Sequence, residues 1–164
     1  MTRDALLALY DRELATTRKL IERIPADKLE WRPHPKSATC MGIGRHLGHM
    51  ITWGLLGLTK DSSDVADRTP AGPTTSVGDL LAMFDRNAAA VRELLAAQSD
   101  ADLQRTWSLT WQGKVVSTAT REAVVSSMIL NHMIHHRGQL SVYLRLNDVA
   151  IPSIYGPTAD EPAV

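Results

Sequence analysis

The longest helical pattern in the chain is TREAVVSSMILNHMIHHRGQLSVYLRLN, residues 120–147. Side chains on one predicted face of this helix recur at spacings of three and four residues. They are Val125, Met128, His132, His136, Gln139, Tyr143 and Leu146. The pattern predicts an amphipathic helix that carries two histidines, one turn apart, on its core-facing stripe.

Three earlier stretches have the same periodicity and predict three more helices. These are residues 2–24, 39–59 and 77–98. Pro25 ends the first, and Ser76 with Asp79 resembles the capping box that starts the third. Residues 60–75 form a long polar link, which suits a crossover rather than a tight hairpin. We therefore expect an all-α fold, a four-helix bundle with a long crossover between helices 2 and 3.

The rest of the chain carries weaker signals. Residues 106–111 alternate polar and apolar side chains before Gln112-Gly113, a pattern compatible with a small hairpin. The tail, residues 148–164, is rich in proline and glycine and is predicted to be irregular. A length of 164 residues corresponds to about one domain, so we expect a single helical-bundle domain over 1–164.

Composition excludes several classes of protein. Lysine plus arginine number 18 and aspartate plus glutamate number 18, so the formal net charge is zero and no global field attracts nucleic acid. The longest apolar region, Met50–Leu58, is far short of the ~20 residues that span a bilayer. We expect neither a nucleic-acid nor a membrane partner.

The single cysteine, Cys40, excludes an intramolecular disulfide and any cluster of thiolates. No basic pair is obviously placed to activate its thiol, so we interpret it as a small hydrophobic residue. Asp4 and Asp11 interrupt the apolar run that a signal peptide needs. A cytoplasmic protein is the expectation.

Five of the six histidines fall in two short clusters, one in the second predicted helix and one in the last. His132 and His136 are four residues apart, a spacing that lets two imidazoles on a helix reach one metal ion. A third ligand could come from His46 or from His49. Three neutral imidazoles leave a position for a water or a substrate thiol, the open geometry of a catalytic metal site.

A plainer interpretation is that these histidines are satisfied residues of the core, since pairs at this spacing arise often by chance. Because two clusters lie on two core-facing stripes, a metal site and the plain interpretation are equally well supported. His34 and His135 are expected to be solvated or to contact a metal ligand without binding the metal themselves. The four tryptophans are expected to fill core and loop positions.

Three segments resemble the DinB family, the DinB/YfiT-like metalloenzymes. These are HMIHHRGQLSVYLR (132–145), the tail YGPTADE (155–161), and RPHPKS (32–37) ahead of the second helix. Nine residues beyond Ser37 stands His46, where the family pattern carries its first metal histidine. The resemblance covers essentially the whole chain. One departure is Met133, where many members carry glutamate.

The resemblance implies a four-helix bundle, usually dimeric, with a divalent metal ion held by His46, His132 and His136. Zinc or nickel is the leading metal, and histidine ligation also suits iron or manganese. The leading function is a thiol S-transferase in detoxification or stress response, with a low-molecular-weight thiol as the small-molecule substrate. The alternatives are a metal-dependent hydrolase and a non-catalytic metal-binding stress protein. No catalytic side chain is assigned, because a metal-bound water or thiol would be the nucleophile.

Overall fold

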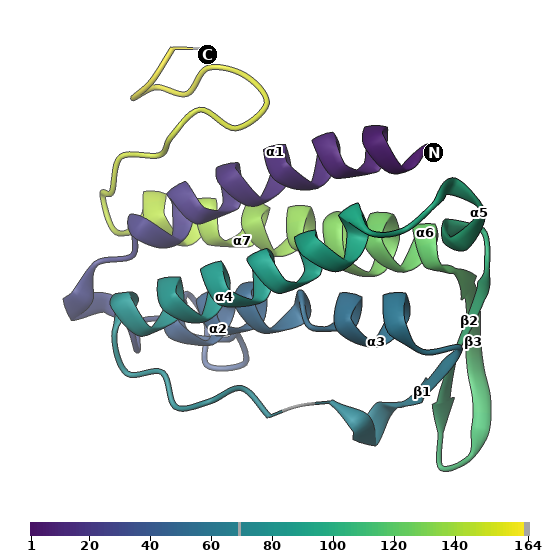
Figure 1. The fold of residues 1–164 in the computed structure, drawn as a ribbon. Helices are drawn as coiled ribbons and strands as arrows, with labels where there is room; N and C mark the ends of the chain where they lie inside the picture. The colour runs from purple at the N-terminus through teal and green to yellow at the C-terminus, as the bar shows by residue number, and fades with distance from the viewer. Residues whose placement is uncertain (69, 163–164) are drawn as a thin grey trace.

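The computed structural model describes residues 1–68 and 70–162. Long helical segments run side by side as a bundle, and a small sheet lies at one end (Figure 1). The bundle consists of α1 (Arg3–Glu22), α2 (Cys40–Met50) with α3 (Trp53–Thr59), α4 (Val77–Ala96), and α7 (His132–Leu146), preceded by α6 (Arg121–Ala123) and the π-helical segment η3 (Val124–Asn131). Short helices lie outside it: η1 (Ala26–Lys28), η2 (Val65–Asp67) and α5 (Asp100–Leu103).

The connection between α3 and α4 is the predicted crossover. It runs back along the bundle, so α2–α3 and α4 point in the same direction, opposite to α1 and α7 (Figure 1). Helix α4 packs on both α1 and α2, and α7 packs on the same two helices. The predicted capping box is confirmed at the start of α4, where Asp79 N donates to Ser76 Oγ at 3.1 Å and Ser76 N donates to Asp79 Oδ2 at 3.0 Å.

The expectation of an all-α fold is wrong, because a three-stranded sheet is present. Its strands are β1 (Ser62–Asp64), β2 (Thr106–Trp111) and β3 (Lys114–Thr120), in the order β1-β2-β3. Strand β1 is parallel to β2, and β2 is antiparallel to β3. Gln112 and Gly113 have φ values of 51° and 75°, the left-handed conformation that a two-residue hairpin turn of this kind requires. The small hairpin compatible with the sequence pattern is therefore present. The predicted bundle and crossover hold, and only the all-α class does not.

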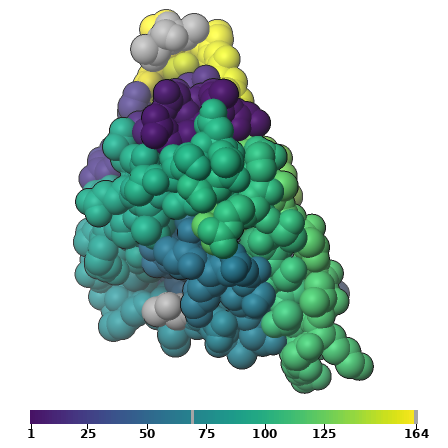
Figure 2. Space-filling view, turned by 45° about the vertical axis from the view of Figure 1, so that its right-hand side comes forward, coloured from purple at the N-terminus to yellow at the C-terminus, as the bar shows by residue number. Residues whose placement is uncertain are grey.

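The hairpin joins the body at one end only. Trp107 is fully buried at its base, and its ring centroid lies 6.2 Å from that of Trp53. At the tip, Trp111 and Val115 are 59% and 63% exposed. Figure 2 shows this part of the chain projecting from the rest of the molecule.

The second predicted helix is not continuous, because it breaks at Ile51 and Thr52. The backbone there forms hydrogen bonds between residues three apart, as in a 3₁₀-helix; for example, Gly54 N donates to Ile51 O at 2.9 Å. A Cβ on Gly54 would lie 2.5 Å from Val91 Cγ1, so only glycine allows α3 to approach α4 this closely. Within the described residues, no helix is long and apolar enough to cross a membrane.

The buried face of the last helix lies one residue along from the predicted stripe. Between Ile129 and Leu144 its most deeply buried residues are Ile129, Leu130, Met133, Arg137, Leu140 and Leu144. Of the predicted stripe, Val125 and Tyr143 are also buried. His132 is exposed and His136 is half-buried, so the expectation that they face the core is wrong. Two features hid the true face: η3 has a wider turn than an α-helix, and a charged residue, Arg137, stands in the middle of the apolar row.

The tail after Asn147 is irregular as far as residue 162, as predicted; residues 163–164 lie outside the described residues. It folds back over α1, where Tyr155 Oη donates to Glu13 Oε2 at 2.7 Å. Arg23 Nη2 donates to Glu161 Oε1 at 2.7 Å, and Asp160 forms an ion pair with Arg145. These contacts attach the tail to α1 and to α7, the first and the last long helix of the bundle.

Candidate metal centre

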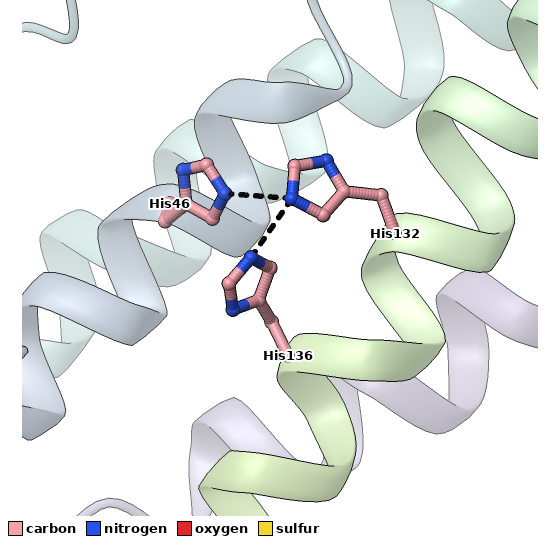
Figure 3. Close-up of side chains that lie close together, drawn as sticks. All are labelled: His46, His132 and His136. Atoms are coloured by element: carbon pink, nitrogen blue, oxygen red, sulfur yellow. Dashed lines mark hydrogen bonds between the residues drawn. The ribbon is translucent and has the colours of Figure 1, made fainter.

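Three histidines from two helices converge on one point (Figure 3). His46 comes from α2, and His132 and His136 come from successive turns of α7. His132 Nε2 lies 3.4 Å from His46 Nε2 and 2.9 Å from His136 Nε2. One ring nitrogen from each of the three lies within 4.8 Å of the others. The packing of α7 against α2 thus creates the cluster.

The spacing of these nitrogens fits a metal ion. Tetrahedral zinc with nitrogen ligands at about 2.0–2.1 Å would separate neighbouring ligand atoms by about 3.3 Å. The observed separations of 3.4 Å and 2.9 Å are close to that value. The three imidazoles also present the same kind of nitrogen to a common point, so a cation would satisfy all three at once.

Two of the three imidazoles, those of His46 and His136, are poised to be neutral, which is the form that binds metal. Partial burial, followed by the nearby His136 and His132 imidazoles, lowers the pKa of His46 to about 4. Burial likewise lowers the pKa of His136 below its usual value. At pH 7 the lone pairs of these two rings are therefore available to a cation.

Gln139 holds one of the three rings in place. Its side-chain oxygen lies 2.8 Å from His136 Nδ1, and its side-chain nitrogen lies 3.2 Å from His135 Nε2. With a proton on Nδ1 bound to that oxygen, the His136 Nε2 lone pair points at the cluster. His135 therefore supports the site through Gln139, in line with the expectation that it is solvated or supporting.

The structure separates the two candidates on α2. His46 belongs to the cluster, whereas His49 does not; its Nδ1 lies 3.3 Å from Arg68 Nη2. The Arg68 guanidinium in turn lies 5.5 Å from the Trp53 ring. Cys40 is buried, and burial raises the pKa of its thiol, so it matches the predicted hydrophobic role.

Met133 is fully buried, whereas His132 beside it is exposed and His136 is half-buried. The side chain at this position lies in the core. The departure from the family pattern at Met133 therefore falls in the interior of the bundle.

A cavity of about 490 Å³ borders the cluster. It is lined by Lys36, Ser37, Ala38, Gly42, Ile43, His46, His136, Gln139 and Tyr143. None of these described lining residues is acidic, and Ile43 and Tyr143 give it apolar surface. A small molecule in this space would contact two of the three histidines.

Sequence reasoning missed a buried ion pair behind the site. Arg137 and Glu13 are each 1% exposed, and Arg137 Nη2 lies 2.9 Å from Glu13 Oε2. Arg137 Nη1 also donates to the Glu13 carbonyl at 3.3 Å, and Tyr155 covers the pair with its ring. The only sequence signal was a charged residue inside an apolar row of α7. The pair ties α7 to α1 directly behind His136.

Known proteins with the same fold agree with this arrangement of helices. The DinB-like protein from Bacillus cereus is 22% identical, with a TM-score of 0.75 over 94% of this chain and 98% of that one. YfiT from Bacillus subtilis is 16% identical, with a TM-score of 0.67 over 89% of this chain and 87% of YfiT. YfiT is described as a probable metal-dependent hydrolase with an unusual four-helix bundle topology.

Sequence comparison gives the family. The uncharacterised protein YrdA of Bacillus subtilis is 24% identical over 164 residues, which cover 98% of this chain and 92% of YrdA. The sequence model of the DinB family matches residues 1–163. The chain therefore belongs to the DinB family.

Proposed function

We propose that this protein is a metal-dependent enzyme that joins a small-molecule thiol to an electrophile. His46, His132 and His136 would hold a divalent cation, with zinc or nickel as the leading candidates. The observation that carries the proposal is the convergence of three ring nitrogens at the edge of a cavity of about 490 Å³. The site is thus both a set of ligands and a place for a substrate.

A divalent cation bound there would lower the pKa of a thiol or a water and so supply a nucleophile at neutral pH. The protein's own residues prepare the site for that role. The depressed pKa of His46 keeps its ring neutral, and Gln139 fixes the orientation of His136. In the reaction, the thiolate sulfur would form a bond to an electrophilic carbon, and the leaving group would depart with its electron pair.

Hydrolysis is the second candidate, because YfiT is described as a probable metal-dependent hydrolase. The cavity lining favours a thiol as the nucleophile. No described lining residue is a carboxylate that could act as general base, so the nucleophile has to ionise without one. A thiol, with a pKa of about 8.5, is close to ionisation at neutral pH before any metal acts on it, whereas a water needs the cation to lower its pKa from about 15.7 to about 7.

The partners remain those expected from the sequence: a small molecule in the cavity and a second copy of the chain. The glycines Gly48 and Gly57 are not available to a dimer contact, because both pack inside the bundle. A Cβ on Gly48 would lie 2.9 Å from Met83 Cε, and one on Gly57 would lie 2.6 Å from Val124 Cγ1. A dimer would use another surface, and light scattering giving a monomer mass across micromolar concentrations would exclude it.

The test is a panel of thiols and electrophiles with protein loaded with zinc or nickel. We expect loss of thiol in proportion to product, abolished in His46→Ala and retained in the matched control His49→Ala. Ester or amide hydrolysis without a thiol would support the hydrolase instead. No turnover by protein that retains its metal would favour the non-catalytic metal-binding alternative.

A further inference from the structure

We propose that the cavity beside the histidines binds an organic anion, with Lys36 as the residue that contacts the negative group. This rests on the proposed function, because it names the class of substrate for the same site. The ligand would carry a carboxylate or another anionic group at one end and its reacting atom at the end near His46 and His136. Its middle would lie against Ile43 and Tyr143.

The first support is the charge of the cavity. Lys36 is the one lysine or arginine among the described lining residues, and no aspartate or glutamate is among them. Three neutral histidines do not cancel the charge of a divalent cation, unlike ligand sets that include a carboxylate. A cavity with a cation at one side and an ammonium at another favours an anionic occupant.

The second support is the way the Lys36 backbone is held. Lys36 N donates to His34 Nδ1 at 3.1 Å, and Ser37 N donates to the His34 carbonyl at 2.9 Å. Next to this turn, Cys40 N donates to Trp31 O at 2.9 Å. The lysine thus extends from an ordered turn, which reduces the entropy lost when it contacts a ligand.

The third support is the link between this turn and the cavity wall. The Trp31 ring packs edge-on against Tyr143, with centroids 5.6 Å apart, and Tyr143 lines the cavity. The turn and helix α7 are therefore held together on both sides of the space. The distance between the ammonium end and the histidine end would select ligands by length as well as by charge.

The experiment compares two probes of nearly equal shape, 3-mercaptopropionate and 3-mercaptopropanamide, which differ by one negative charge. Their dissociation constants are measured by calorimetry with zinc-loaded and with metal-free protein. We expect the carboxylate to bind about tenfold more tightly than the amide to zinc-loaded protein, in line with a charge-assisted contact. The preference should fall as salt is added, because the lysine is exposed.

Lys36→Gln should remove most of this preference, whereas the matched control Lys28→Gln should keep it. Comparing the two probes in both variants cancels any intrinsic difference between them. An unchanged preference in Lys36→Gln, or no binding of either probe, overturns the proposal. Turnover with thiols but no charge preference would refute only the anion site, and a preference dependent on Lys36 without turnover would refute only the proposed function.

Discussion

His136 and Arg137 are neighbours in the sequence but face two different environments. His136 is half-buried and lines a cavity, and its Nδ1 lies 2.8 Å from the side-chain oxygen of Gln139. Arg137 is 1% exposed and lies between α1 and the tail, in contact with Glu13 and the Tyr155 ring. The comparison teaches that one helix carries the histidine cluster on one face and an anchoring ion pair on the next. The two roles should respond to different perturbations.

The largest effect should come from breaking the buried pair. Arg137→Met leaves the Glu13 carboxylate without its buried cation, and we expect a loss of about 3–5 kcal/mol in the free energy of unfolding. Urea denaturation of metal-free protein measures it. The matched control is Arg12→Met, because Arg12 also contacts Glu13 but is 67% exposed, and its removal should cost about 1 kcal/mol or less.

The double variant Glu13→Leu/Arg137→Met separates anchoring from charge. Apolar residues of similar size often replace a buried ion pair without loss, so most of the stability should return. A double variant as unstable as Arg137→Met alone would contradict this view of the pair.

The second effect concerns the histidine face. Zinc at about 100 times its dissociation constant should stabilise the protein by about 2.7 kcal/mol at pH 7 and by much less at pH 5, because the ligands must lose protons to bind. His132→Ala should abolish this gain while changing the stability of metal-free protein by about 0.5 kcal/mol or less, since His132 is exposed. Melting curves with zinc and with EDTA provide the measurement.

A smaller effect is expected at the contact between the tail and the pair. Tyr155→Phe removes the hydroxyl that donates to Glu13 Oε2 and should cost about 1.5 kcal/mol. Chemical denaturation would detect it. Zinc affinity should stay unchanged, because the tail lies behind α7; a tenfold loss of affinity would show that the two faces are coupled.

The most gradual effect, spread over more than two pH units, is the pH dependence of metal-free protein. The pKa of His46 is about 4 in the folded protein, below the ordinary value of about 6.5 in the unfolded chain. Between these values the unfolded chain binds a proton that the folded site does not, so stability is complete above pH 6.5 and falls toward pH 4. His46→Asn should flatten this part of the profile; the same slope in both proteins would contradict the assignment.

Local signals in the sequence predicted much of the fold. Pro25, the Ser76–Asp79 cap and the Gln112-Gly113 turn each act within a few residues, and each predicted the correct local structure. Strand β1 gave no such signal, because Ser62 lies opposite Ser108, far along the chain. Its formation depends on a tertiary contact that local pattern cannot reveal.

The three histidines predicted as metal ligands lie together in the structure, whereas their surroundings were not predicted. The spacing of His132 and His136 indicated that both could bind one metal ion, and the resemblance added His46 as the third ligand. The prediction that this face is buried was wrong, because η3 shifts the helical register and Arg137 interrupts the apolar row. Lys36 and Gln139 gave no signal of their own as site residues, since the cavity forms only when α2 and α7 pack together.

The central claim is that His46, His132 and His136 hold a divalent metal ion. The most direct test is metal analysis of protein purified without an affinity tag, for the unaltered chain and for four single alanine variants. We predict roughly one ion per chain in the unaltered protein and in His49→Ala, and none in His46→Ala, His132→Ala or His136→Ala. Metal retained by His46→Ala but lost from His49→Ala, or an unaltered protein that binds neither zinc nor nickel, would contradict the claim.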